Sequence, residues 1–366
     1  MIHTRLIIRP LLLVVRSSEL GYAKIHNIFE KSKTSCFVLL FACLFVTSRW
    51  IISYLMRYIG EIISLGVACS WTIAALSSEV GSRRFGVFVM NVWRMGMALL
   101  FSAILMWVIF GSPYPVFAGP VTWGWLLLSG VVGYFFGDWC LFNCYLVIGS
   151  RYGQLFMTLA PMFTALTAWV MLGQTLSWNS LLAMAVTLTG IAISVLGRGD
   201  HHKISFQLPT KGILFGIGAG LGQGVGLVLS KIGLDHYITD VPSDLLSSFE
   251  NYLPFGSNMI RCVAGLVCFS LWLFLRGEAS SFRSSIHDWK GLAIIVLVVF
   301  SGPFIGVGFS LMAVQYTAAG IASTLMALTP ILILWPSRWL FGQPITFRNI
   351  LGAIISCAGV SLFFLL

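Results

Sequence analysis

Charged residues are scarce in this sequence. They make up 9% of its 366 residues, whereas an ordinary soluble domain contains roughly a quarter. Acidic residues are the fewest, with 12 Asp and Glu against 22 Lys and Arg, while hydrophobic residues reach 58% and the mean hydropathy is +0.93. This composition excludes an ordinary soluble domain. It predicts a protein of the lipid bilayer.

Signatures of catalysis and of ATP use are missing as well. The sequence contains no His-Glu-x-x-His motif, no Gly-x-Ser-x-Gly turn and no cluster of intramembrane acids and histidines. We therefore expect no enzymatic activity, no cofactor and no metal. The ATP-binding pattern Gly-x-x-x-x-Gly-Lys is also absent, so any uphill movement of a solute must draw on ion or solute gradients.

Long apolar runs are what the sequence does contain. A helix needs about 20 apolar residues to cross the hydrocarbon core of a bilayer. Strand-like alternation of period two is missing, so the runs predict helices and exclude a membrane barrel. A weaker run at 35–55 precedes ten strong ones. The strong runs lie near 60–78, 88–110, 122–148, 152–172, 177–196, 212–232, 256–275, 290–314, 318–341 and 345–366.

The ten strong runs form two similar sets of five. Four short patterns occur once in each set and keep their order, with small changes in spacing. They are Ser78-Glu79-Val80-Gly81 and Ser230-Lys231-Ile232-Gly233, Asn91-Val92-Trp93-Arg94 and Asn258-Met259-Ile260-Arg261, Ala160-Pro161 and Thr329-Pro330, and Gly173-Gln174 and Gly342-Gln343. This duplication predicts a two-repeat transporter core whose binding site lies where the halves meet.

The basic residues follow the spans rather than forming a dense patch, which argues against a nucleic-acid partner. They lie in the loops after spans one, three, five, seven and nine, whereas the opposite loops 111–121 and 173–177 carry no charge and 234–255 is acidic. The positive-inside rule predicts that the basic loops are cytoplasmic, although Arg49 and Arg57 oppose this orientation. The basic set is Arg83, Arg84, Arg151, Arg198, Lys203, Lys211, Arg276, Arg283, Lys290 and Arg348.

Four segments fall outside the simple repeat pattern. Residues 1–56 have no counterpart in the second half and are either an extra helix with a basic tail or an artefact of a start assigned upstream of Met56; we favour the second hypothesis. The polar stretch 199–211 is interpreted as a linker between repeats at 57–198 and 212–366. The insert 234–255 is interpreted as an exposed loop, with or without a short surface helix; a lid is the alternative. The glycine-rich run 216–226 is interpreted as a packing helix that either bends during transport or packs without movement.

Asp138 is the strongest candidate for a functional group. It lies well inside the third span, where a carboxylate costs roughly 2.5 to 3.5 kcal/mol on insertion scales. A water-filled cavity, a cation, a partner arginine or protonation can offset that cost, and protonation would suit proton coupling. The alternative is a structural role, in which Asp138 pairs with a helix end or a neighbouring amide. The corresponding position of the second half is close to Val307, so this charge breaks the repeat symmetry.

Arg94 and Arg261 occupy equivalent positions in spans two and seven. Each follows an asparagine by three residues, Asn91 and Asn258. The two arginines either bind anionic groups, pair as gates with acids such as Glu79, or extend to the lipid headgroups. The other candidates for a cavity lining are Trp71, Asn143, Gln154 and Gln223.

Two stretches resemble the EamA repeat of the drug/metabolite transporter superfamily. The first contains Ala160-Pro161 and Leu172-Gly173-Gln174 and ends at Thr189-Gly190, and the second contains Thr329-Pro330 and Phe341-Gly342-Gln343 and ends at Ala358-Gly359. The resemblance covers about 57–366. It implies an all-α fold of ten transmembrane helices, built as two inverted five-helix repeats around a central cavity that moves small metabolites by alternating access.

The sequence departs from this family at Gln174 and Gln343, where members often have Glu, so a charge-based gate at these positions is in doubt. We expect a secondary transporter or exporter of a small-molecule substrate, with proton coupling through Asp138 as one possibility. A non-transporting scaffold or a membrane enzyme is the alternative. Because both repeats are present in one chain, we expect a monomer. We expect it to lie in the inner membrane of a bacterium.

Overall fold

The structure is a computed structural model. It describes residues 58–173, 177–198, 204–206, 208–249, 252–306, 309–310, 313, 316, 325–342 and 345–365. All elements named below belong to the unit Ile59–Leu366. The alternatives for residues 1–56, and the positions Gln174, Val307 and Gln343, lie outside the described residues.

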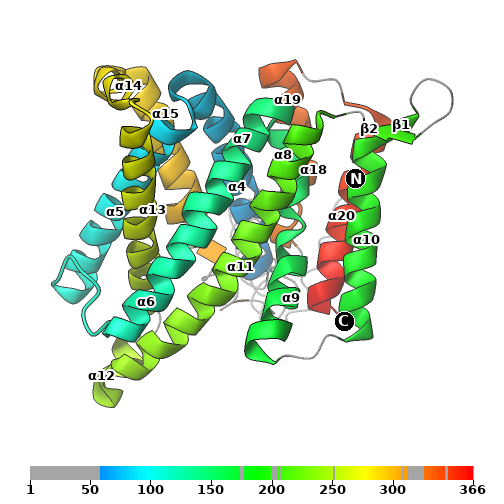
Figure 1. Cartoon of the computed structure of the whole chain (residues 1–366). Helices are drawn as coiled ribbons and strands as arrows, with labels where there is room; N and C mark the ends of the chain where they lie inside the picture. Colours follow the sequence, from blue (N-terminus) through cyan, green and yellow to red (C-terminus); the bar gives the residue numbers. More distant parts are fainter. Residues whose placement is uncertain are drawn as a thin grey trace, which may run out of the picture. The chain divides into compact units, whose positions relative to one another are not determined.

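The first half is a series of long helices joined by short turns (Figure 1). Gly86 and Gly149 have positive φ values of 78° and 87°, which let one residue separate two helices. The predicted loop after the third span is therefore only Gly149, and Arg151 is buried in the first turn of the next helix rather than in a loop. The elements are α4 (Ile59–Phe85), α5 (Val87–Phe110), α6 (Pro120–Ser129), η1 (Gly130–Gly137), α7 (Asp138–Ile148), α8 (Ser150–Met157), α9 (Ala160–Leu172) and α10 (Trp178–Val195).

A short hairpin lies at the end of the first half. Its strands are β1 (Leu196–Arg198) and β2 (Ile204–Phe206), paired antiparallel with Leu196 opposite Phe206. The strands occupy the end of the predicted first repeat and part of the predicted linker.

The second half repeats the pattern with one sharp bend. The short helix α14 and the following helix meet at 93°. The elements are α11 (Thr210–Asp240), α12 (Ser243–Phe249), α13 (Leu253–Leu275), α14 (Ala279–Ser285), α15 (Trp289–Val299), η4 (Phe300–Gly306), α18 (Thr329–Leu332), α19 (Leu334–Phe341) and α20 (Phe347–Leu365).

The insert predicted as a loop at 234–255 is partly helical, because α11 continues to Asp240 and α12 follows. Tertiary hydrogen bonds hold this extension against the loop before α6. The Asp240 carboxylate accepts from the Gly119 N–H at 2.8 Å and the Thr122 hydroxyl at 2.6 Å, and the Tyr237 hydroxyl donates to the Val116 carbonyl at 2.9 Å.

Seven helical segments of the described residues are long and apolar enough to cross a membrane, and the bent pair that contains α15 would make eight. The chain is therefore a multi-pass integral membrane protein. The predicted span 318–341 is described only from residue 325 onward, so the count of ten is not reached among the described residues.

Glycines let α11 approach two neighbouring helical segments closely. One stripe, Gly216, Gly220 and Gly224, lies against Phe156, Leu159 and Phe163 of the α8–α9 segment. The other stripe, Gly218, Gly222 and Gly226, lies against Cys140, Gly137 and Gly133 of the η1–α7 segment. Helix packing in membranes depends on such small residues, because lipid tails are as apolar as the side chains. The helix α11 is continuous through this run.

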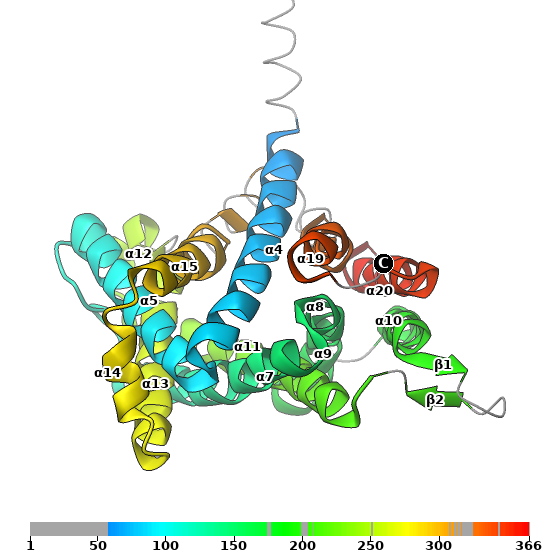
Figure 2. The same ribbon diagram turned by 90° about the horizontal axis from the view of Figure 1, so that it is seen from above.

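The last helices of the two halves, α10 and α20, pack against each other and run antiparallel (Figures 1 and 2). Gly190 lies against Ser356, and Gly359 lies against Thr187; a Cβ atom at either glycine would collide with its neighbour. The pair stands beside α8 and α9, on the side away from α5 and α13 (Figure 2).

Candidate functional site

A cavity of about 600 Å³ lies between the two halves. Its lining comes from α4, α5, η1, α7, α8 and α9 of the first half and from α11, α13, α15, η4, α18 and α20 of the second. Cavities of this volume accommodate small metabolites. Most lining side chains are apolar, and the charged ones among the described residues, Arg94, Asp138 and Arg261, come from α5, α7 and α13.

A π-helical segment positions the charged part of the lining. The segment η1 ends at Gly137, and Asp138 is the first residue after it. The second half has a π-helical segment at the corresponding place, η4, which ends at Gly306. Single π-helical turns are rare and are found frequently at functional sites.

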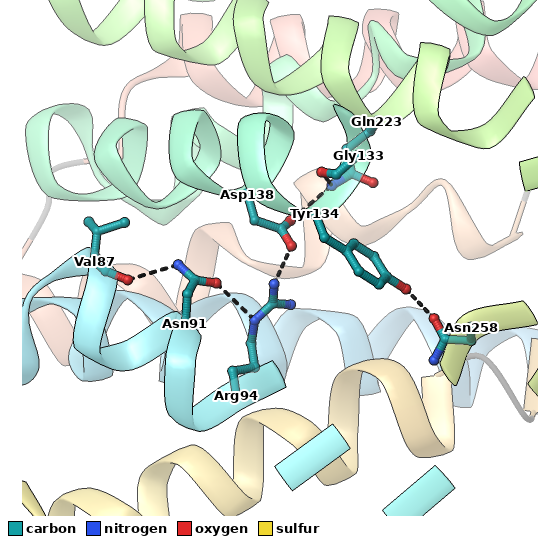
Figure 3. A network of polar contacts seen from close by, with 8 residues as sticks. All are labelled: Val87, Asn91, Arg94, Gly133, Tyr134, Asp138, Gln223 and Asn258. Carbon is teal, nitrogen blue, oxygen red and sulfur yellow. Dashed lines mark hydrogen bonds and ion pairs between the residues drawn. The ribbon is translucent and has the colours of Figure 1, made fainter. Parts of the chain in front are cut away.

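Asp138 is held by one arginine and one amide (Figure 3). One Nη of Arg94 donates to Asp138 Oδ2, and Gln223 Nε2 donates to Asp138 Oδ1 at 2.9 Å. The same Gln223 nitrogen lies 3.2 Å from the Gly133 carbonyl. Arg94 is held in turn by Asn91, whose Oδ1 accepts from Arg94 Nε at 3.2 Å. Both oxygens of the carboxylate therefore have partners.

The Arg94–Asp138 ion pair offsets the cost of placing two charges at membrane depth. Only 12% of the Arg94 side chain and 6% of the Asp138 side chain are exposed, so bulk water solvates neither charge fully. The Arg94 guanidinium also lies 5.0 Å from the centre of the Phe142 ring. Among the offsets considered from the sequence, the structure supplies a partner arginine.

Arg261 occupies the equivalent position in the second half but has different surroundings. Its guanidinium lies over the Tyr134 ring, 4.4 Å from the ring centre, and makes no ion pair with any described residue. The Tyr134 hydroxyl donates to Asn258 Oδ1 (Figure 3), which fixes the ring under the arginine. The two equivalent arginines are thus electrostatically distinct.

The remaining candidates from the sequence divide into two groups. Trp71, Gln154 and Gln223 line the cavity, and Gln154 Nε2 donates to the Tyr145 hydroxyl at 2.7 Å. Asn143 does not line the cavity, and its amide donates to the Trp139 carbonyl of its own helix at 2.7 Å. Asn91 and Asn258 also lie behind the lining, where they hold Arg94 and Tyr134.

The sequence analysis named Trp71 but missed three other aromatic residues of the described lining. Tyr134, Phe142 and Tyr145 face the cavity, and Tyr134 and Phe142 each carry an arginine on the ring face. In an apolar span an aromatic residue is common and gives no signal of its own. The two tyrosines differ from the phenylalanine residues of this span only by their hydroxyl groups.

Glu79 does not pair with either cavity arginine. This carboxylate is fully buried, accepts from Arg83 at 2.7 Å and from the Ser150 N–H at 2.6 Å, and so joins α4 to the start of α8. The Arg83 guanidinium lies 5.6 Å from the centre of the Phe341 ring at the end of α19. The gate suggested between the cavity arginines and Glu79 is absent from this arrangement.

Another ion pair joins the end of α4 to the loop before α15. Arg84 donates to both oxygens of Asp288, at 2.7 Å to Oδ1, and Asp288 also accepts from the Gly291 N–H at 3.1 Å. The Arg84 guanidinium, and after it this N–H, holds the pKa of Asp288 below its usual value. The pair ties the first half to the second at one end of the helices.

Comparisons with known proteins agree with this arrangement. The model of the EamA-like transporter family matches residues 58–196 and 210–365. A solved structure described as "Crystal structure of protein" aligns with a TM-score of 0.52 and 13% identity, covering 84% of this chain and 97% of that one. At this identity the likeness shows the fold alone. No curated protein matches the sequence.

Proposed function

Because this chain belongs to the EamA-like transporter family of the drug/metabolite transporter superfamily, we propose that it is a secondary transporter that moves a small metabolite through the central cavity by alternating access. The observation that carries the proposal is the cavity of about 600 Å³ between the halves, with the buried Arg94–Asp138 ion pair in its lining. Buried charges at membrane depth are costly and are typical of solute or ion pathways.

Reciprocal contacts support two inverted repeats. At the spacing that relates Gly190 to Gly359, Thr187 corresponds to Ser356. Gly190 lies against Ser356 and Gly359 lies against Thr187, so exchanging the repeats exchanges the two contacts. Since α10 and α20 run antiparallel, the axis relating them is perpendicular to the helices, as in transporters with inverted repeats.

The first and third spans of the two repeats also make reciprocal contacts, across the cavity. Gln223 of α11 lies against Gly137 at the end of η1, and its counterpart Trp71 of α4 lies against Gly306 at the end of η4. Each first helix thus packs on the third span of the other repeat.

We propose ten spans in repeats at 57–198 and 212–366, joined by a linker at 199–211. Both repeats needed for the cavity are present in one chain, so we propose that a monomer suffices.

The Arg94–Asp138 pair is the proposed site of proton coupling. Protonation of Asp138 would remove its attraction to Arg94, and α5 and α7 would then be free to separate. Arg94 and Asp138 come from different spans of the first repeat, so breaking their bond changes how those spans pack. A proton gradient would in this way bias the alternation between inward-open and outward-open states.

Proteoliposomes with an imposed pH gradient test the proposal. A panel of organic acids, amino acids, amines, sugars and nucleosides is added, and luminal pH and solute uptake are recorded for wild type and Asp138→Asn. We expect at least one class to be taken up with gradient dependence by wild type, and the same class to move without that dependence in the variant.

The matched control is Asp235→Asn, which removes a carboxylate from the exposed Lys231–Asp235 pair on α11. It should retain the gradient dependence of wild type. Identical gradient dependence in wild type and Asp138→Asn would overturn the coupling role. Absence of uptake for every class by folded wild-type protein would overturn transport.

A further inference from the structure

We infer that the cavity selects an organic monoanion, an amphipathic carboxylate without an ammonium group, and that Arg261 binds its carboxylate. This inference rests on the proposed function and specifies its substrate class. The first argument is the charge of the lining. Two arginines and a single acid, Asp138, line the cavity among the described residues, and Asp138 is engaged by Arg94. The described lining therefore carries one net positive charge, and Arg261 makes no ion pair with a described residue.

The sequence limits where a missing counterion could come from. The corresponding position to Asp138 in the second repeat is close to Val307, and residues 307–324 contain no Asp or Glu. No acid of the described residues other than Asp138 faces the cavity. A charge of one sign enclosed in a mostly apolar lining favours a ligand of the opposite sign, because the low dielectric strengthens their attraction.

Arg261 also has a donor without an acceptor. Its Nε is buried and makes no hydrogen bond with a described residue, and its guanidinium lies over the Tyr134 ring. A buried donor without an acceptor is costly, and a carboxylate that binds the guanidinium in a fork would provide that acceptor. Asn258 supports the arrangement from behind through the Tyr134 hydroxyl.

The same geometry disfavours an ammonium group. An ammonium ion binds best to a carboxylate, and Asp138 is the only acid among the described lining residues. Arg94 and Gln223 already hold its two oxygens, and two of the lining rings, Phe142 and Tyr134, already carry Arg94 and Arg261. A cationic or zwitterionic solute would therefore find no free carboxylate among the described lining residues and would meet two guanidinium groups.

The rest of the lining suits an apolar body. Met95, Leu141, Met157, Val298 and Met326 face the cavity together with Trp71. Burial of apolar ligand surface here contributes affinity at roughly 25 cal/mol per Å². The preferred ligand thus combines one carboxylate with an aromatic or branched apolar group.

Three probes with the same ring and different charge test this inference. They are 3-phenylpropanoate, phenylalanine and 2-phenylethylamine, measured by thermal shift of the purified full-length protein and by uptake into proteoliposomes. We expect 3-phenylpropanoate to bind at least about tenfold more tightly than the other two, as the loss of a charge-assisted hydrogen bond implies. Arg261→Gln should lose about tenfold to a hundredfold in affinity for it.

Arg261→Lys keeps the charge without the fork and should lie between wild type and Arg261→Gln. The matched control is Arg276→Gln, which removes an exposed cation at the C-terminal end of α13, the helix that carries Arg261. This variant should bind 3-phenylpropanoate like wild type. Equal or tighter binding of the amine or the zwitterion, no binding of 3-phenylpropanoate, or unchanged affinity in folded Arg261→Gln would each overturn the inference. Uptake of another solute class in those cases would leave the proposed transport function standing.

Discussion

Removing one partner of the Arg94–Asp138 pair should destabilise the protein more than removing both. The structure leaves 12% of the Arg94 side chain and 6% of the Asp138 side chain exposed, so an unpaired charge at either place is poorly solvated. Loss of one partner of a buried pair costs about 3 to 5 kcal/mol. The cavity admits some water, so we expect about 3 kcal/mol for Arg94→Gln and for Asp138→Asn separately.

In the double variant neither charge is left alone. Only the hydrogen bonds change, at about 1 kcal/mol each, and Asn91 and Gln223 remain beside the site as neutral partners. The double variant should therefore lose about 1 to 2 kcal/mol, much less than the sum of the single losses. The coupling free energy of the pair is the difference between that sum and the loss in the double variant.

The assay is unfolding by SDS titration in mixed micelles, followed with a thiol-reactive dye. Among the described residues, Cys140, Cys144, Cys262 and Cys357 are buried and become reactive when the helices separate. A control cycle on the exposed Lys231–Asp235 pair should give a coupling of about 0 to 1 kcal/mol. Additive losses for Arg94→Gln and Asp138→Asn would refute the reasoning, because they would mean that neither group depends on the other's charge.

Two further predictions concern the ends and the edge of the bundle. Because the Arg84 guanidinium holds the pKa of Asp288 below its usual value, the stabilisation contributed by this pair should be constant well above the unfolded-state pKa of about 3.9 and should be lost as the pH falls below that value and through the lower folded-state pKa. A pH-independent difference in melting temperature between wild type and Asp288→Asn would contradict this. Gly190→Ala should lower the free energy of unfolding, measured by SDS titration, by about 1 to 3 kcal/mol, because the added Cβ would collide with Ser356. The control is Gly96→Ala, where a Cβ has open space, and it should be neutral or stabilise by up to about 1 kcal/mol. Equal effects of the two substitutions would contradict the close packing of α10 on α20.

Much of the fold follows from the sequence because the bilayer imposes a simple rule. A helix must be apolar over about 20 residues to cross the hydrocarbon, so the long runs predict the spans from α4 to α11, and α13, to within several residues. The errors lie where a single residue or a distant contact decides a boundary. Gly149 alone reverses the chain before Arg151, and hydrogen bonds of Asp240 and Tyr237 to the loop before α6 accompany the extension of α11 into the predicted insert.

The sequence predicted most of the charged and amide residues of the candidate site, but it did not predict which of them contact each other. Asp138, Arg94 and Arg261 stand out because charge is rare in apolar spans. Nothing in the sequence says that Asn143 bonds within its own helix, or that Tyr134 supports one of the arginines.

The sequence by itself determined the membrane class, the family and the duplication, since these depend on composition and local patterns that survive along the chain. Only the tertiary structure decided which of two equivalent arginines is neutralised. Arg94 and Arg261 have the same local setting in the sequence, yet the third span of the first repeat brings Asp138 to Arg94 and an aromatic ring to Arg261. Electrostatic pairing depends on distance between side chains from different helices, and that distance is set by packing.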